Sequence, residues 1–337
     1  MKLAIRSLVA IFALICQTAD AQQISLPQAN DDWYVQGQMI LKQRMSIRPI
    51  NHLAKNVILM IGDGNDPTTI IATRIFAGQL TGKPGEEHVL PYEKFPYVAY
   101  SKTYNTNAQT PDSAGTASAM MTGVKTLAGV IGVTANVRRG NCADAEANLA
   151  TTIGELTEAA GMATGIVTTT RITHATPAAV FAHSADRGWE VDSRMPDEAA
   201  DDCKDIAAQL IDFPFGDGID VAMGGGRRNF IGTGDADPED EDRHGKRKDG
   251  RNLVNEWKAK SNNHVVIYDT AGFDALDTNS RPKVLALFAR SHMNFETDRA
   301  DDVAGEPSLA DMTKKAIEIL SLEEKGYFLM VEGGRID

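Results

Sequence analysis

Cysteine and positive charge are both scarce in this sequence. Its 337 residues include three cysteines, no two of which have the Cys-x-x-Cys spacing of a structural zinc site. The 34 Lys and Arg are outnumbered by 46 Asp and Glu, which gives a formal net charge of -12. Because an acidic surface repels phosphate backbones, a protein that coats DNA or RNA is excluded. A small phosphate ester held by bound cations is not excluded, since cations reverse the local charge.

Long apolar runs are also missing, so no segment is long and apolar enough to anchor the chain as a transmembrane helix. Hydrophobic residues make up 42% and charged residues 24% of the chain, values that exclude disorder or a collagen-like fold for most of it. The length suits one large domain or two modest ones.

The first 21 residues have the pattern of a secretory signal peptide. Lys2 and Arg6 supply positive charge, residues 8–16 form a short apolar run, and Ala19-Asp20-Ala21 fits a small-x-small cleavage site. A buried core helix is the alternative interpretation, while a lipid anchor on Cys16 is disfavoured by the bulky residue before it. We expect cleavage after residue 21 and export of the domain formed by residues 22–337.

The cysteine count agrees with export. Cys16 leaves with the signal peptide, and Cys142 and Cys203 remain. An even pair in an oxidising compartment indicates one disulfide, with two separate buried thiols as the alternative.

Short apolar strands alternate with helical stretches along most of the chain. The strands are expected at residues 56–62, 163–170, 219–223, 265–268, 284–288 and 327–331. The helices are expected at 68–80, 113–123, 151–160, 205–211 and 309–320. This alternation predicts an α/β fold of three layers, with a central, mainly parallel sheet and helices on both faces. The charged segment 235–248 is expected to be a solvated surface loop, and a surface cation site is the alternative.

Carboxylates follow two of the predicted strands. Asp63 stands between Gly62 and Gly64 at the end of the first strand, and Glu332 and Asp337 follow the last one. Ligand groups of parallel sheets lie at the carboxyl edge, so these three acids can hold cations through oxygen. A simple turn residue is the alternative interpretation of Asp63.

Ser113 begins a predicted helix of small residues and follows Pro111 and Asp112. It is either the N-cap of this helix or a nucleophile at a helix N-terminus, where free N–H groups stabilise phosphate. No histidine adjoins it and no Gly-x-Ser-x-Gly elbow is present, so a metal would have to activate it.

Three further side chains are candidates for a phosphate site. After the strand that ends near residue 170, Thr176 can offer its hydroxyl to a metal, and His174 can order the water around that metal. Arg187 can grip phosphate oxygens in bidentate fashion, or it can serve as a surface ion-pair partner.

Together these segments resemble the alkaline phosphatase family from about residue 32 to residue 337. The matching stretches are residues 55–64, 95–104, 111–117, 167–177, 203–210, 224–227 and 331–337. The chain is more similar to the animal-type branch, because His174 stands where the enteric bacterial branch carries Asp. The family implies hydrolysis of phosphate monoesters through two zinc ions and one magnesium ion.

The resemblance also implies roles for single residues. Ser113 is the nucleophile, becomes phosphoserine and contacts one zinc. Asp63 bridges this zinc and the magnesium, and Asp337 is a ligand of the other zinc. Arg187 clamps the phosphate, and Asp112 positions Arg187.

The remaining implied roles concern the magnesium site, the disulfide and the assembly. Thr176 and Glu332 complete the magnesium site, with His174 close to it. Cys142 and Cys203 fall where animal-type members have a disulfide. A homodimer is the family's expected assembly.

The resemblance further implies a fourth, calcium-like cation in a peripheral lobe at about residues 230–308. Glu239, Glu306 and the Phe288 carbonyl are candidates for it. Ala289 stands where an acid would be expected.

Family members supply further zinc ligands beyond the position of Asp337. We therefore expect the chain to be cut short at its C-terminus and, as it stands, to lack turnover. The alternative to a secreted phosphomonoesterase is thus a fragment that binds metal or phosphate without catalysis. A sulfatase is disfavoured because it needs a different Cys or Ser motif.

Overall fold

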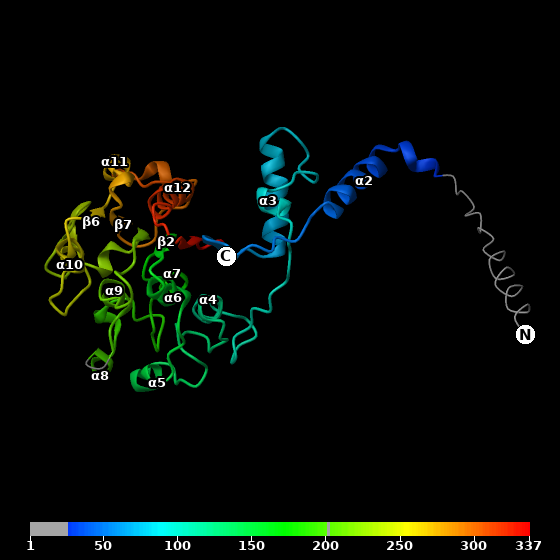
Figure 1. The fold of residues 1–337 in the computed structure, drawn as a ribbon. Helices are drawn as coiled ribbons and strands as arrows, with labels where there is room; N and C mark the ends of the chain where they lie inside the picture. The colour runs from blue at the N-terminus through cyan, green and yellow to red at the C-terminus, as the bar shows by residue number, and fades with distance from the viewer. Residues whose placement is uncertain (1–25, 201–202) are drawn as a thin grey trace, which may run out of the picture. The chain divides into compact units, whose positions relative to one another are not determined.

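The computed structural model describes residues 26–200 and 203–337 (Figure 1). The predicted signal peptide lies outside the described residues. The described residues form two compact units, one of residues 26–52 with 91–98 and the other of residues 53–90 with 99–200 and 203–337. Each unit is described by itself below.

The smaller unit is built around the helix α2 (Asp32–Met45), which is preceded by the short turn η1 (Pro27–Asn30). Asp31 caps α2 by accepting hydrogen bonds from the Trp33 and Tyr34 N–H groups at 3.0 and 3.3 Å. Arg44 donates to the Phe95 carbonyl at 3.1 Å and so joins α2 to the segment that follows η2 (Pro91–Lys94). No side chain of α2 is buried.

The larger unit contains a six-stranded sheet with the order β1-β8-β2-β3-β7-β6, in which every neighbouring pair is parallel. The strands are β1 (Val57–Gly62), β2 (Ala163–Arg171), β3 (Val221–Gly225), β6 (His264–Ile267), β7 (Lys283–Ala289) and β8 (Tyr327–Gly333). Each predicted strand is present with its bounds shifted by a few residues at most. The prediction of a mainly parallel sheet is confirmed.

Helices cover both faces of this sheet (Figure 1). One face packs against α4 (Ser113–Thr122), α7 (Ala175–Ala178), α9 (Ile206–Ile211) and α10 (Leu253–Lys260), and the other against α11 (Thr270–Ala275) and α12 (Leu309–Leu320). Successive side chains of a strand point to opposite faces, so Ile166 belongs to the first core and Val167 to the second. The three-layer α/β prediction is therefore confirmed.

The predicted helices are all present: α3 (Pro67–Leu80), α4, α6 (Ile153–Ala159), α9 and α12. Six helices were not predicted from the sequence, because they are short or weakly patterned: α2, α5 (Cys142–Glu146), α7, α8 (Asp197–Ala200), α10 and α11. No helix in the described part of the chain is long and apolar enough to cross a membrane.

Cys142, the first residue of α5, is joined to Cys203 by a disulfide with a Cα–Cα distance of 5.8 Å. This confirms the predicted pair. The bond ties α5 to the segment that leads into α9.

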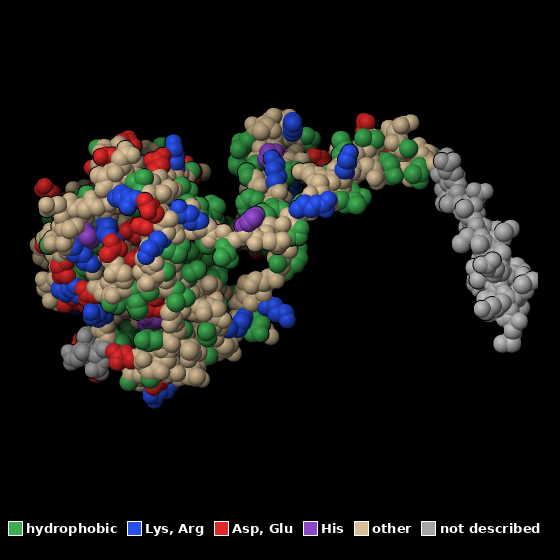
Figure 2. Space-filling view, viewed as in Figure 1, with side chains coloured by type: hydrophobic (Ala, Val, Ile, Leu, Met, Phe, Trp, Pro, Cys, Tyr) green, Lys and Arg blue, Asp and Glu red, His purple; other side chains and the backbone are tan. Residues whose placement is uncertain are grey.

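The charged segment 235–248 was expected to be a solvated loop, and this is wrong for part of it. The segment forms the hairpin β4 (Ala236–Asp237) and β5 (Asp240–His244), and β5 is largely exposed. Asp237 and Arg247 are nevertheless buried, because each forms an ion pair with a partner from another segment, Arg227 and Asp205 respectively. On the face shown in Figure 2, acidic and basic side chains are interspersed over the larger unit.

Candidate active site

Asp63 and Asp337 are brought together by the ends of β1 and β8. The Asp63 N–H donates to the Gly333 carbonyl at 3.0 Å, and the Ile336 N–H donates to the Asp63 carbonyl at 3.0 Å. Gly64 has a φ of +89°, and a Cβ at that position would lie 2.4 Å from the Asp337 backbone nitrogen. Only glycine allows this close approach. The two acids predicted at strand ends therefore share one edge of the sheet.

Ser113 is the first residue of α4 and faces Asp63. Its Oγ donates a hydrogen bond of 3.1 Å to Asp63 Oδ1. The N-cap is Asp112, which accepts from the Gly115 N–H at 3.0 Å, so the alternative interpretation of Ser113 as the cap is wrong. Burial raises the pKa of the Asp63 carboxyl, the Ser113 hydrogen bond opposes this rise, and the nearby Asp337 charge adds to it.

Asp112 also holds Arg187. Arg187 Nη1 donates to Asp112 Oδ2 at 3.0 Å, and the same oxygen accepts from the Gly129 N–H at 3.0 Å. Burial of Asp112 disfavours its charge, but the hydrogen bonds from Gly115, Arg187 and Gly129 outweigh burial and lower the pKa. The resulting carboxylate orients the Arg187 guanidinium beside the start of α4.

His174 lies on the other side of Arg187, whose Nη2 donates to His174 Nε2 at 3.1 Å. Because a guanidinium can only donate, Nε2 accepts and the proton rests on Nδ1. Nδ1 is buried and has no partner among the described residues. Burial, with the charges of Arg187 and Arg171, lowers the pKa of His174 to about 4, so the ring is neutral near pH 7.

Glu332 is fully buried at the end of β8. Its Oε2 accepts from the hydroxyls of Thr168 at 2.5 Å and Thr170 at 3.0 Å, whereas Oε1 has no partner in the described part of the chain. Burial raises the pKa of Glu332, and the Thr176 hydroxyl is close enough to oppose this rise. Neither Glu332 nor Asp63 has an ion pair with a described Lys or Arg. A buried carboxylate with a free oxygen fits a bound cation.

A sequence model of the alkaline phosphatase family matches residues 54–337. The chain belongs to the alkaline phosphatase family. The resemblance found in the sequence is therefore confirmed.

Individual alkaline phosphatases are similar over most of the chain. The tissue-nonspecific isozyme of Homo sapiens is 45% identical over 313 residues, which are 90% of this chain and 59% of that protein. Alkaline phosphatase of Gadus morhua is 43% identical over 319 residues, or 92% of this chain and 65% of that protein.

The solved structures that are similar are also alkaline phosphatases. The Thermus thermophilus enzyme matches with a TM-score of 0.64 and 25% identity, over 92% of this chain and 54% of that one. The Shewanella enzyme matches with a TM-score of 0.60 and 29% identity, over 83% of this chain and 56% of that one. The chain thus spans less than two thirds of the length of these relatives.

Several residues of this alkaline phosphatase site were not predicted from the sequence. Thr168 and Thr170 hold Glu332, and the signal was a run of threonines at the end of an otherwise apolar strand. His292 packs edge-on against His174 with ring centroids 5.4 Å apart. Asn105 donates to Asp112 Oδ1 at 2.9 Å from a loop without any pattern that would mark it.

The residues proposed for a peripheral cation only partly come together. Glu239 and Glu306 line one cavity of about 700 Å³, which Asp302 also lines. Both oxygens of Glu239 are paired with the Arg227 guanidinium, one of them at 2.7 Å. Burial raises the pKa of Glu306 to about 7, and the charges of Asp302 and Glu239 add to the rise. The Phe288 carbonyl stays a prediction as a ligand.

A second acidic cluster resembles a metal site but already contains a cation. Asp192, Asp205 and Asp249 have ligand oxygens within 4.8 Å of one another. Arg247 donates to Asp205 at 2.9 and 3.0 Å and also pairs with Asp249. The guanidinium therefore supplies the positive charge that this cluster needs.

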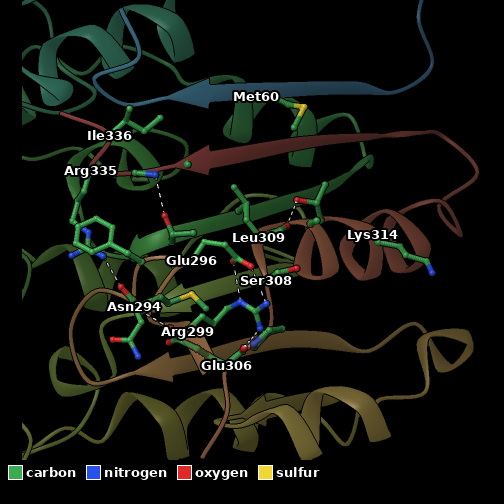
Figure 3. Close-up of a pocket in the computed structure, with 18 of the residues that line it drawn as sticks. Met60, Asn294, Glu296, Arg299, Glu306, Ser308, Leu309, Lys314, Arg335 and Ile336 are labelled. Carbon is green, nitrogen blue, oxygen red and sulfur yellow. Dashed lines mark hydrogen bonds and ion pairs between the residues drawn. The ribbon is translucent and has the colours of Figure 1, made fainter. Parts of the chain in front are cut away.

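A cavity of about 880 Å³ lies beside the candidate site (Figure 3). It is lined mainly by α12 and by residues between 293 and 308, with Met60 of β1 and the residues that end and follow β8, and neither Ser113 nor Arg187 lines it. It adjoins the site at the end of β8 and at Thr169 of β2.

Proposed function

We propose that this protein hydrolyses phosphate monoesters through a phosphoserine at Ser113 and releases an alcohol and inorganic phosphate. The observation that carries the proposal is the position of Ser113 Oγ at the first turn of α4, hydrogen-bonded to Asp63. Membership of the alkaline phosphatase family supports the same reaction.

In this proposal Ser113 Oγ attacks phosphorus, the Oγ–P bond forms and the P–O bond to the leaving alcohol breaks. Asp63 Oδ1 accepts the hydrogen bond of the Ser113 hydroxyl and so orients Oγ, while a bound metal would lower the pKa of that hydroxyl. Water then attacks the phosphoserine, which releases phosphate and restores the hydroxyl.

Charge on the phosphoryl oxygens has two sources of stabilisation within this chain. The Asp112 cap takes the Gly115 N–H, and the N–H groups of Ser113 and Ala114 at the start of α4 would donate to the phosphoryl group. Arg187 adds a guanidinium held in place by Asp112 and His174. These groups recognise the phosphate alone, which agrees with a broad range of monoesters.

Metal ions are part of the proposal. Asp63, Thr176 and Glu332 would hold magnesium, and Asp63, Ser113 and Asp337 offer oxygens to two zinc ions. The unpartnered Glu332 Oε1 supports a cation there, and a mutant alkaline phosphatase of the Antarctic bacterium TAB5 is described with bound magnesium. Bound zinc would lower the pKa of the Ser113 hydroxyl and stabilise the leaving oxygen.

Export after cleavage of residues 1–21, a homodimer and a calcium-like ion near Glu239, Glu306 and Phe288 stay predictions. The disulfide supports an oxidising compartment. A relative from Bombyx mori, 43% identical over 293 residues, is named a membrane-bound alkaline phosphatase.

The test is Ser113→Ala against Ser280→Ala, an exposed serine far along the chain that serves as the matched control. Protein loaded with zinc and magnesium is assayed with a chromogenic monoester and quenched in acid for peptide mass spectrometry. We expect Ser113→Ala to lose the phosphopeptide, together with any turnover that the unaltered chain has, and Ser280→Ala to lose neither. Phosphopeptide formation in Ser113→Ala would overturn the assignment, and metal or phosphate binding without turnover in the unaltered chain would favour the non-catalytic alternative.

A further inference from the structure

Five basic side chains gather at the carboxyl ends of β2, β3 and β7. We call them the cationic cluster: Arg171, Arg194, Arg228, Lys246 and Arg290. Arg171 ends β2, Arg228 lies in the turn η4 (Arg227–Asn229) directly after β3, and Arg290 follows β7. The Arg228 N–H donates to the Arg290 carbonyl at 3.3 Å, and the Lys246 N–H donates to the Arg228 carbonyl at 2.8 Å. The backbone therefore holds these residues together.

The acids that pair with Arg194 and Arg290 are each shared with a second cation. Glu190 is buried and binds Arg171 with two hydrogen bonds of 2.6 and 2.7 Å, so it reaches Arg194 only at 3.3 Å. Arg290 reaches Asp237 at 3.4 Å, and that acid already binds the Arg227 guanidinium at 2.8 Å. One acid is thus shared between two guanidinium groups in each case.

Arg228 and Lys246 have no side-chain hydrogen bond or ion pair within the described residues. Arg228 Nε is a buried donor without an acceptor. A buried, unpaired donor costs free energy, and like charges close by add to that cost. Burial, with the charges of Arg171 and Arg194, lowers the pKa of Arg228, as expected for a site that has more positive than negative charge.

The cluster adjoins the proposed phosphate clamp. Arg171 Nη1 contacts His292 Nε2 at 2.5 Å, the His292 ring packs against His174, and His174 accepts from Arg187. Both groups lie at the carboxyl ends of the strands, the edge where parallel sheets bind ligands. The cationic cluster and the Arg187 clamp are therefore neighbours, connected through His292 and His174.

We propose that Arg194, Arg228, Lys246 and Arg290 bind a phosphate group at a second site, separate from Ser113. Guanidinium forks match the tetrahedral oxyanion, and the ligand would give Arg228 Nε its missing acceptor. The phosphate is either free inorganic phosphate or the distal phosphate of a substrate that carries two. Only binding of a substrate's distal phosphate rests on the proposed function.

The first arm measures inorganic phosphate binding by titration calorimetry in an Arg187→Gln background, which weakens the catalytic clamp. Arg228→Gln with Lys246→Gln is compared with Arg281→Gln and Lys314→Gln, two exposed basic residues outside the cluster. We expect the cluster variant to bind phosphate about tenfold more weakly or worse. The control should change affinity by about twofold at most, because salt screens remote charges.

Thermal unfolding separates loss of the site from loss of the fold. Without phosphate, the cluster variant should melt no lower than the unaltered chain, because two repelling charges are removed. Phosphate should raise the Tm of the chain with an intact cluster and have a smaller effect on the cluster variant. A variant that melts lower without phosphate, or one that phosphate stabilises equally, contradicts the proposal.

The second arm compares kcat/KM for a monophosphate and a bisphosphate, with Arg187 intact. If the site holds a substrate's distal phosphate, the cluster variant loses about tenfold on the bisphosphate only. If the cluster variant binds inorganic phosphate more weakly but keeps the same ratio of kcat/KM for the bisphosphate to kcat/KM for the monophosphate, the site binds free phosphate. Unchanged phosphate binding, or an equal loss in the control variant, overturns the proposal. Absence of turnover would count against the proposed function alone, since the calorimetric arm requires no catalysis.

Discussion

Ser113 Oγ and Asp63 Oδ1 lie 3.1 Å apart although 50 residues separate them in the chain. The first residue of α4 thus faces the carboxyl that leaves the end of β1. The hydrogen bond orients the serine hydroxyl at the carboxyl edge of the sheet, beside the acids proposed to hold the metals.

Asp112→Asn tests how far the Arg187 clamp depends on charge. Asn can keep the helix cap, but its NH2 group cannot accept the hydrogen bonds that Arg187 and Gly129 donate to Oδ2, so the free energy of unfolding should fall by about 1–3 kcal/mol. Loss of the charged partner of Arg187 should lower kcat/KM for monoesters by about tenfold to a hundredfold. Steady-state kinetics and urea unfolding measure the two effects.

The matched control for Asp112→Asn is Asp269→Asn, which alters the N-cap of α11 away from the site. It should leave kcat/KM unchanged. Equal activity of both variants would show that Asp112 serves only as a cap.

Glu332→Gln tests the buried carboxylate as a cation ligand. With Glu332 uncharged, magnesium affinity should fall about tenfold or more, because a carboxylate is replaced by a neutral amide. In chelator, where no cation can compensate the buried charge, the variant should melt no lower than the unaltered protein. Titration calorimetry with magnesium and thermal unfolding in chelator are the measurements.

Glu318→Gln is the control for Glu332→Gln, since Glu318 is exposed on α12. It should behave like the unaltered chain in both experiments. Unchanged magnesium binding by Glu332→Gln would remove Glu332 from the proposed ligand set.

Glu158 makes stability depend on pH. Burial, with the nearby charge of Asp220, raises the pKa of Glu158 from 4.5 to about 8 in the folded protein. Between these values the folded state keeps the proton that the unfolded state releases, so the free energy of unfolding falls as pH rises through this window. Glu158→Gln should remove this contribution and raise stability at the alkaline end.

Urea unfolding at several pH values across that window measures the slope. Glu324→Gln, at an exposed position, should keep the slope of the unaltered chain. If Glu158→Gln had the same slope of unfolding free energy against pH as the unaltered chain, the Glu158 carboxyl would have to be ionised in the folded state.

Much of the fold could be predicted because its strands are short apolar runs that stand out from their surroundings. β8 and α12 were predicted almost to the residue, since a buried parallel strand and an amphipathic helix have distinct periods. The helices α5 and α8 were missed, because four or five residues are too few to show a helical period. Asp63 and Ser113 were identified from their places at a strand end and a helix start, whereas Arg187 received its role as a clamp from the family resemblance.

The sequence by itself determined which residues end the strands and begin α4, because hydrophobic pattern and small residues are local properties. Only the tertiary structure decided their charge states and partners. Arg187 lies between Asp112 and His174, Glu332 keeps one oxygen free, and the Nε atom of Arg228 is buried without an acceptor among the described residues. Burial and partnership are set by side chains distant in the chain, and desolvation and charge act through space, so no local pattern could have shown them.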